Sequence, residues 1–183
     1  MYAQKIRAGA SFPPITVLDA DGEPRDISTP ANGHDWLLVI AYRGAHCPMC
    51  TRYLNELEPL LGQFHELGVD VLAVSADNVE QVTRHREQLN ISFPLYHGLT
   101  VEQMETLGLY VSDPRPGETD HRFGEPGMFV IDPEGRIQIV DVSNNPFARP
   151  ELSVIVKGIR WMQQENYPIR GQYVSSDVAA AST

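Results

Sequence analysis

The sequence has only two cysteines, few positive charges and no long apolar run. A secreted domain held together by disulfides would carry more cysteines at wider spacing, so that class is excluded. The longest apolar stretches, such as residues 36–42, are far shorter than the roughly 18–20 residues needed to cross a bilayer, which argues against a membrane protein. Lys and Arg number 14 against 24 Asp and Glu, a formal net charge of -10, so a nucleic-acid partner is not expected.

The first 15 residues contain no apolar segment of the kind that a secretory signal requires, which predicts a cytoplasmic protein. A length of 183 residues with a hydrophobic share of 42% is typical of one folded domain with its own core. We expect that domain to span residues 1–174. The small and polar residues 175–183 are expected to form a flexible tail.

Alternation of apolar and helical patterns predicts an α/β protein. The continuous apolar run Trp36–Tyr42 is typical of a strand buried on both faces. A helical spacing of apolar residues follows over residues 48–67, and Pro59 predicts a kink or a restart of that helix. The remaining expected strands cover residues 15–19, 69–75, 93–96, 127–132 and 136–141, and the remaining helices cover residues 78–89, 100–107 and 151–165. This order indicates a central mixed sheet flanked by helices, the three-layer pattern of the thioredoxin fold.

The two cysteines form a Cys47-Pro-Met-Cys50 motif directly after the first long strand and at the start of a helix. Backbone N–H groups and the positive end of the helix dipole stabilise a thiolate at such a position, and the thiolate is the nucleophile. A spacing of three residues places Cys50 one turn further along, beside Cys47. We therefore interpret Cys47 as the nucleophile and Cys50 as the resolving thiol.

Two other interpretations of the pair are weaker. A structural zinc site needs four ligands, and the sequence has neither a second CxxC nor a His-x3–5-His pair. Two inert core cysteines would not require the strand-to-helix turn around Gly44 and Pro48. Redox chemistry is the preferred interpretation, and no metal or organic cofactor is expected.

Residues 9–173 resemble the thioredoxin-like superfamily, in particular its AhpC/TSA, peroxiredoxin-like branch. The segments that carry the resemblance are Tyr42-Arg-Gly-x-x-Cys-Pro-x-Cys50, Phe129-Val-Ile-Asp-Pro-Glu-Gly135 and, more weakly, Glu165–Gly171. The resemblance implies a thiol-dependent oxidoreductase with an antioxidant role. It also implies an external thiol reductant, such as a thioredoxin or glutathione system.

The sequence departs from the peroxiredoxin pattern Pro-x-x-x-Thr/Ser-x-x-Cys. A register that ends on Cys47 places Ile40 and Gly44 at the two key positions, and one that ends on Cys50 places Arg43 and Cys47 there. Peroxiredoxins also carry an arginine just before the late strand, where this sequence has Pro126. That proline resembles the cis-proline of thioredoxins, so we expect a cis peptide bond there.

Four further residues bear on proton and charge transfer. Ala41 stands where thioredoxins keep a buried acid, so proton transfer needs another group, either His46 or water. His46 as an imidazolium would lower the pKa of Cys47. Arg43 is a candidate to support a thiolate or to contact a substrate acid. Arg122 is a candidate for the missing arginine, although a solvated loop charge is the better interpretation.

The sequence leaves the substrate open. The family resemblance favours a hydroperoxide, whereas the CxxC motif and Pro126 favour a protein or small-molecule disulfide. A metal-binding or redox-sensing module without catalytic activity is a third and weaker alternative.

Overall fold

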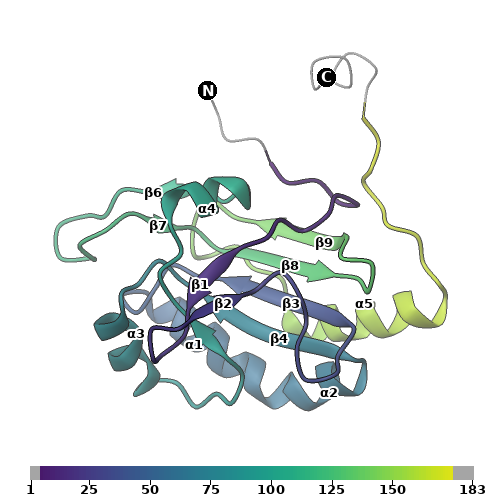
Figure 1. The fold of residues 1–183 in the computed structure, drawn as a ribbon, viewed down its shortest axis with the longest axis horizontal. Helices are drawn as coiled ribbons and strands as arrows, with labels where there is room; N and C mark the ends of the chain where they lie inside the picture. Colours follow the sequence, from purple (N-terminus) through teal and green to yellow (C-terminus); the bar gives the residue numbers. More distant parts are fainter. Residues whose placement is uncertain (1–4, 175–183) are drawn as a thin grey trace.

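A five-stranded mixed sheet forms the centre of the protein (Figure 1). The computed structural model describes residues 5–174, so the expected tail 175–183 lies outside the described residues. Strand order is β5-β4-β3-β8-β9, with β4 parallel to β3 and to β5, and β8 antiparallel to both β3 and β9. The strands are β3 (Trp36–Ala41), β4 (Val69–Val74), β5 (Leu95–Tyr96), β8 (Gly127–Ile131) and β9 (Ile137–Val142). The expected mixed sheet of a thioredoxin-like fold is confirmed.

The long helical pattern after β3 forms three consecutive pieces. They are α1 (Pro48–Leu57), the 3-10 turn η1 (Glu58–Leu60) and α2 (Leu61–Glu66). Pro59 lies in the 3-10 turn because proline has no N–H group for the α-helical hydrogen bond and its ring crowds the preceding turn. The expected interruption is therefore confirmed.

The other helices begin close to the residues that the sequence indicates. Asn78 caps α3 (Val79–Arg86) and Thr100 caps α4 (Val101–Thr106), each in a reciprocal capping box with the glutamine three residues later. The last helix, α5 (Leu152–Gln164), starts after Glu151. No helix among residues 5–174 is long and apolar enough to cross a membrane.

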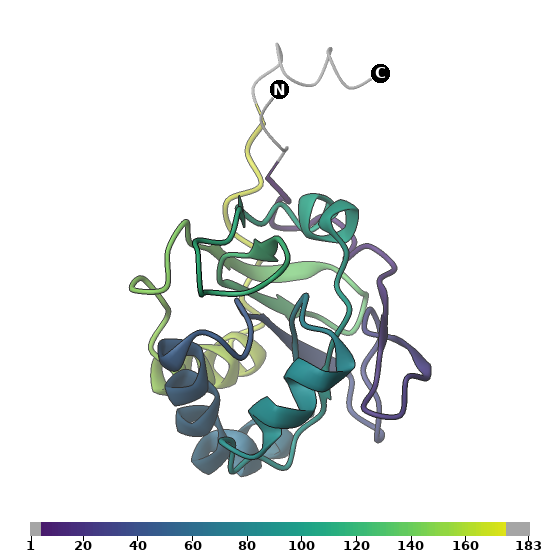
Figure 2. The ribbon, with the colours of Figure 1, turned by 90° about the vertical axis from the view of Figure 1, so that its left-hand side faces the viewer.

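Two apolar layers enclose the sheet. Inward residues of α1, α2, α3 and α5 pack on one face, in the cluster that also contains both cysteines. The other face packs against α4 and the small hairpin of β1 (Thr16–Leu18) and β2 (Pro24–Asp26). Figure 2 shows the sheet edge-on between these two layers.

The polar segment 113–124 differs from the expected loop at its end. Phe123–Gly124 form strand β7, which pairs antiparallel with β6 (Val111–Ser112). Phe123 is fully buried, and this single large apolar residue anchors an otherwise polar segment. The pairing brings Glu118 and Glu125 close to the turn that precedes α1, as described below.

Candidate active site

Cys47 is the N-cap residue of α1, and Pro48 is the first helical residue. The Cys47 N–H donates to the Gly44 carbonyl at 3.1 Å, and the Cys47 carbonyl accepts from the Cys50 N–H at 3.0 Å. Both cysteines are free thiols, with exposed fractions of 2% for Cys47 and 0% for Cys50. The turn after β3 therefore holds the two sulfurs side by side under the protein surface.

The two thiols have opposite acidities. The Cys50 thiol donates a hydrogen bond to Cys47 and, together with the Arg43 guanidinium, lowers the pKa of Cys47 to about 6 in spite of burial. Burial, followed by the neighbouring Cys47 sulfur, raises the pKa of Cys50 far above its ordinary value. This asymmetry favours Cys47 as the thiolate and Cys50 as the protonated thiol at neutral pH.

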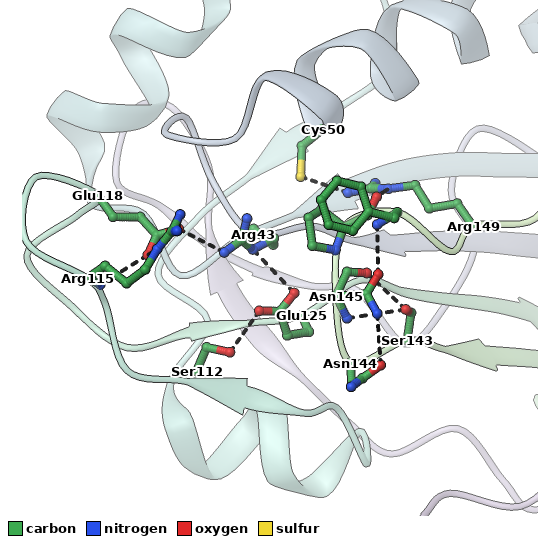
Figure 3. Close-up of polar contacts among 12 residues, drawn as sticks. Arg43, Cys50, Ser112, Arg115, Glu118, Glu125, Ser143, Asn144, Asn145 and Arg149 are labelled. Carbon is green, nitrogen blue, oxygen red and sulfur yellow. Dashed lines mark hydrogen bonds and ion pairs between the residues drawn. The ribbon is translucent and has the colours of Figure 1, made fainter.

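Arg43 is the cation beside Cys47. Its Nη2 lies 2.8 Å from Glu118 Oε1 and its Nε lies 3.2 Å from Glu125 Oε2 (Figure 3). The same guanidinium lowers the pKa of Cys47. Ser112 donates to the other oxygen of Glu125 at 2.7 Å. Arg115 is the main cause that lowers the pKa of Glu118 to about 2, so that carboxylate stays ionised. Two carboxylates thus fix the guanidinium in its place at the sulfur.

Gly44 gives the turn before Cys47 its shape. Its φ of +131° is a conformation that L side chains rarely adopt, and a Cβ atom there would lie 2.4 Å from Asp77 Oδ1. Asp77 is 1% exposed, and its Oδ2 accepts the Ala45 N–H at 2.9 Å. The turn therefore wraps closely around a buried carboxylate.

Replacement of Gly44 by alanine is expected to lower the free energy of unfolding of the reduced protein by about 1–3 kcal/mol, because it adds both backbone strain and the contact with Asp77. Urea unfolding measures the change. G22A is the matched control, since Gly22 also has a positive φ of +81° but a Cβ atom added there would meet nothing within 4 Å. Equal losses in the two variants would contradict the tight contact at Asp77.

The model of the AhpC/TSA family matches residues 8–140 of this chain. The chain belongs to the AhpC/TSA family. Among its curated relatives is the peroxiredoxin Bcp of Escherichia coli, which is 30% identical over 138 residues, covering 74% of this chain and 85% of that protein. A putative peroxiredoxin of Mycobacterium tuberculosis is 27% identical over 135 residues, covering 74% and 84%. The thiol-disulfide oxidoreductase ResA of Halalkalibacterium halodurans is 27% identical over 125 residues, covering 68% and 66%.

Solved structures agree on the fold of this AhpC/TSA protein. A peroxiredoxin-like protein from Aquifex aeolicus has a TM-score of 0.71 at 19% identity, with 87% of this chain and 89% of that chain covered. Peroxidoxin BcpB from Mycobacterium tuberculosis has a TM-score of 0.68 at 18% identity, with 87% and 97% covered. From the family and its curated relatives, the protein is a thiol-dependent peroxidase or oxidoreductase.

Two expectations about this AhpC/TSA site need correction. Pro126 is not preceded by a cis bond, since residues 5–174 contain no cis peptide bond. Trans is the lower-energy isomer unless contacts select cis, and here Glu125 is already held by Arg43 while the Pro126 carbonyl accepts the Ser143 N–H at 2.9 Å.

His46 does not supply a positive charge, because burial and then Arg43 lower its pKa to about 4. The neutral His46 ring packs on the Phe123 ring, with the two ring centroids 4.6 Å apart.

Arg122 does not lie against the thiols. Its Nε pairs with Asp113 Oδ1 at 2.7 Å, and the two side chains are 61% and 79% exposed. This agrees with the interpretation of a solvated loop charge. The resemblance implies an arginine just before the late strand, where this sequence has Pro126. Arg122 does not take the place of that arginine beside the thiols.

Arg149 also contacts the thiol pair, although the sequence alone did not identify it as a site residue. Its Nη2 donates to Cys50 Sγ at 3.0 Å, although the two residues are 99 positions apart (Figure 3). The residue lies between β9 and α5 in a segment rich in Asn and Pro, a composition that indicates only a loop. Each sulfur of the pair thus has its own arginine, Arg43 for Cys47 and Arg149 for Cys50.

Proposed function

We propose that this AhpC/TSA protein reduces hydroperoxides through the Cys47–Cys50 pair. The Cys47 thiolate attacks the hydroxyl oxygen of the peroxide, the O–O bond breaks, and Cys47 becomes a sulfenic acid while the alkoxide or hydroxide that leaves takes a proton from solvent water and becomes an alcohol or water. The Cys50 thiol then attacks the Cys47 sulfur, which forms the internal disulfide and releases water. An external thiol system, of the thioredoxin or glutathione type and in the cytoplasm, restores the dithiol by exchange.

The observation that supports a peroxide substrate is a thiolate held below the surface. Cys47 has a lowered pKa of about 6 but is only 2% exposed. A hydroperoxide is small enough to approach such a sulfur, whereas the disulfide of a folded protein is much larger. Burial also strengthens the field of Arg43 at the reacting atoms, because little water screens it.

A thiol–disulfide oxidoreductase is the second candidate. It is favoured by the CxxC pair at a helix N-terminus and by the likeness to ResA. A lowered pKa at Cys47 serves thiol exchange as well as peroxide reduction, so acidity alone does not distinguish the two functions. Within residues 5–174 no group of three or more His, Cys, Asp or Glu side chains is placed to hold a metal ion, which gives the metal-binding alternative no support from the described site.

The deciding measurement is the stopped-flow rate of hydrogen peroxide with the fully reduced protein, compared with free cysteine at matched thiolate fraction. We expect the protein to react at least about a hundredfold faster, the scale on which one preorganised donor contributes. Oxidised glutathione tested in parallel provides the comparison substrate. A peroxide rate equal to that of free cysteine, with a fast reaction toward the disulfide, would overturn the proposal and favour the second candidate.

A further inference from the structure

We propose that Arg149 is a catalytic residue of the second chemical step, in which it stabilises the sulfur of Cys50 as that sulfur attacks oxidised Cys47. The inference rests on the proposed function, since it concerns the closure of the internal disulfide that the proposed cycle requires. It assigns the two arginines of the site to two successive reactions. Arg43 serves the attack on peroxide, and Arg149 serves the attack that follows.

The guanidinium of Arg149 is held at the sulfur from several sides. Nη2 lies 3.0 Å from Cys50 Sγ, and Nε donates to the Pro146 carbonyl at 3.0 Å. The group lies over the ring of Tyr53 at 5.1 Å, and the Tyr53 hydroxyl donates to the carbonyl of the next residue, Pro150, at 2.7 Å. The Pro146 and Pro150 carbonyls belong to the loop that carries Arg149, so these hydrogen bonds fix the loop as well as the side chain. The orientation of the guanidinium is therefore set before the reaction begins.

The loop that carries Arg149 is itself anchored. The Ser143 N–H donates to the Pro126 carbonyl at 2.9 Å, and the Ser143 hydroxyl donates to the Asn145 carbonyl at 2.9 Å (Figure 3). Pro126 directly precedes β8, the strand that pairs with β3. The loop is therefore tied to the strand beside the one that leads into the cysteine turn.

The charge balance around the two arginines differs. Arg43 has two carboxylate partners, Glu118 and Glu125. In the part of the chain that the structure describes, Arg149 forms no ion pair, and its hydrogen-bond acceptors are a carbonyl and the Cys50 sulfur. The positive charge of Arg149 is thus available to an anion at Cys50, which has no exposed surface through which water could stabilise it.

The order of events follows from the coupling between the sulfurs. In the reduced protein, burial and then the adjacent Cys47 thiolate raise the pKa of Cys50 and keep it protonated. Once Cys47 is a sulfenic acid, that negative charge is gone while Arg149 remains. Cys50 then loses its proton, its sulfur bonds to the Cys47 sulfur, and the Cys47 S–O bond breaks. The hydroxyl group leaves as water with the proton from Cys50, so Cys50 is oxidised and the Cys47 sulfur is reduced with no further reactant.

A pulse of hydrogen peroxide on the reduced R149M protein tests the assignment. Quenching at successive times with a sulfenic-acid trap, followed by mass spectrometry, separates sulfenate formation from disulfide closure. A hydrogen bond to a charged group contributes about 1.5–3 kcal/mol, so we expect closure to be about 10–100-fold slower in R149M, while sulfenate formation changes less than about threefold. R149K should recover part of the closure rate. R52M is the control, because Arg52 lies on the same helix as Cys50 but is 81% exposed and pairs with Glu56.

A second readout separates charge stabilisation from a structural role. In the C47S background the Cys50 thiolate can be titrated by its ultraviolet absorbance, and adding R149M is expected to move that titration to higher pH, whereas R52M should not. Unchanged closure together with an unchanged titration would overturn the assignment. A fall in sulfenate formation equal to the fall in closure would also overturn it, because Arg149 would then act on the peroxide step. Failure of the unmodified protein to form either sulfenate or internal disulfide after the peroxide pulse would instead contradict the proposed function, and the Cys50 titration would still report on the contact with Arg149.

Discussion

Replacement of Cys47 by serine is expected to abolish peroxide reduction, lowering the rate by at least about a thousandfold. A serine hydroxyl remains protonated at neutral pH, and loss of the nucleophile removes the first step of the cycle rather than slowing a later one. The measurement is peroxide consumption by the reduced protein with a small dithiol as the regenerating reductant. Unfolding curves of the variant should stay close to those of the unmodified protein, because sulfur and oxygen differ little in size at this buried position.

The C50S variant is the matched partner of this experiment. It keeps the Cys47 nucleophile and a hydroxyl donor beside it, so the first reaction with peroxide is expected to proceed. The cycle then stops at the Cys47 sulfenic acid, which a trapping reagent detects by mass. If C47S retained the fast reaction and C50S lost it, the roles of the two cysteines would be the reverse of those assigned here.

Replacement of Arg43 by methionine is expected to slow the reaction with peroxide about 10–100-fold at pH 6. The Cys50 thiol and the Arg43 guanidinium both favour the Cys47 thiolate, and a hydrogen bond from a charged donor is worth about 1.5–3 kcal/mol. Because the pKa of Cys47 is lowered to about 6, the rate in the unmodified protein should rise with pH through that value and then level off. In R43M the same rise is expected at higher pH, since the thiolate needs a higher pH to form.

The pH profile distinguishes loss of charge from loss of structure. Loss of the Arg43 charge shifts the profile to higher pH, whether or not the high-pH rate also falls, whereas a distorted site lowers the rate at every pH without shifting the profile. R122M is the control, because Arg122 is exposed and paired with Asp113 away from the thiols. An unshifted profile in R43M, or an equal shift in R122M, would show that Arg43 is not the cation that acts on Cys47.

Local signals were enough to predict much of the fold. The apolar run at Trp36–Tyr42 marks the central strand β3, since a strand covered on both faces is apolar along its whole length. Pro59 indicates the break between α1 and α2, and Thr100 with Gln103 marks the start of α4. The position of Cys47 at a helix N-terminus follows from the same reasoning, because a strand and a helix adjoin the motif.

The charged surroundings of the thiols were much harder to predict. Glu118 and Glu125 reach Arg43 only because β6 and β7 pair, and two-residue strands leave almost no periodic signal. Arg149 contacts Cys50 across 99 residues from a loop with no pattern of its own. Burial also decides that His46 is neutral, and burial of a loop residue depends on tertiary packing. The residues next to the Cys47–Cys50 motif therefore indicate its chemistry. The charge states of those side chains depend on contacts with segments that are far away in the sequence.

Cys50 is completely buried and contacts Arg149. Oxidation and regeneration of the thiol pair therefore require different amounts of local opening of the protein. Oxidation by a small peroxide can proceed in the closed structure, so its rate should increase in proportion to peroxide concentration. A reductant protein has to bring its own thiol to two buried sulfurs, one of which contacts Arg149 in the Ser143–Pro150 loop, so we expect this loop to open locally first. Regeneration should accordingly reach a maximum rate as the reductant concentration increases, and that maximum equals the frequency at which the loop opens.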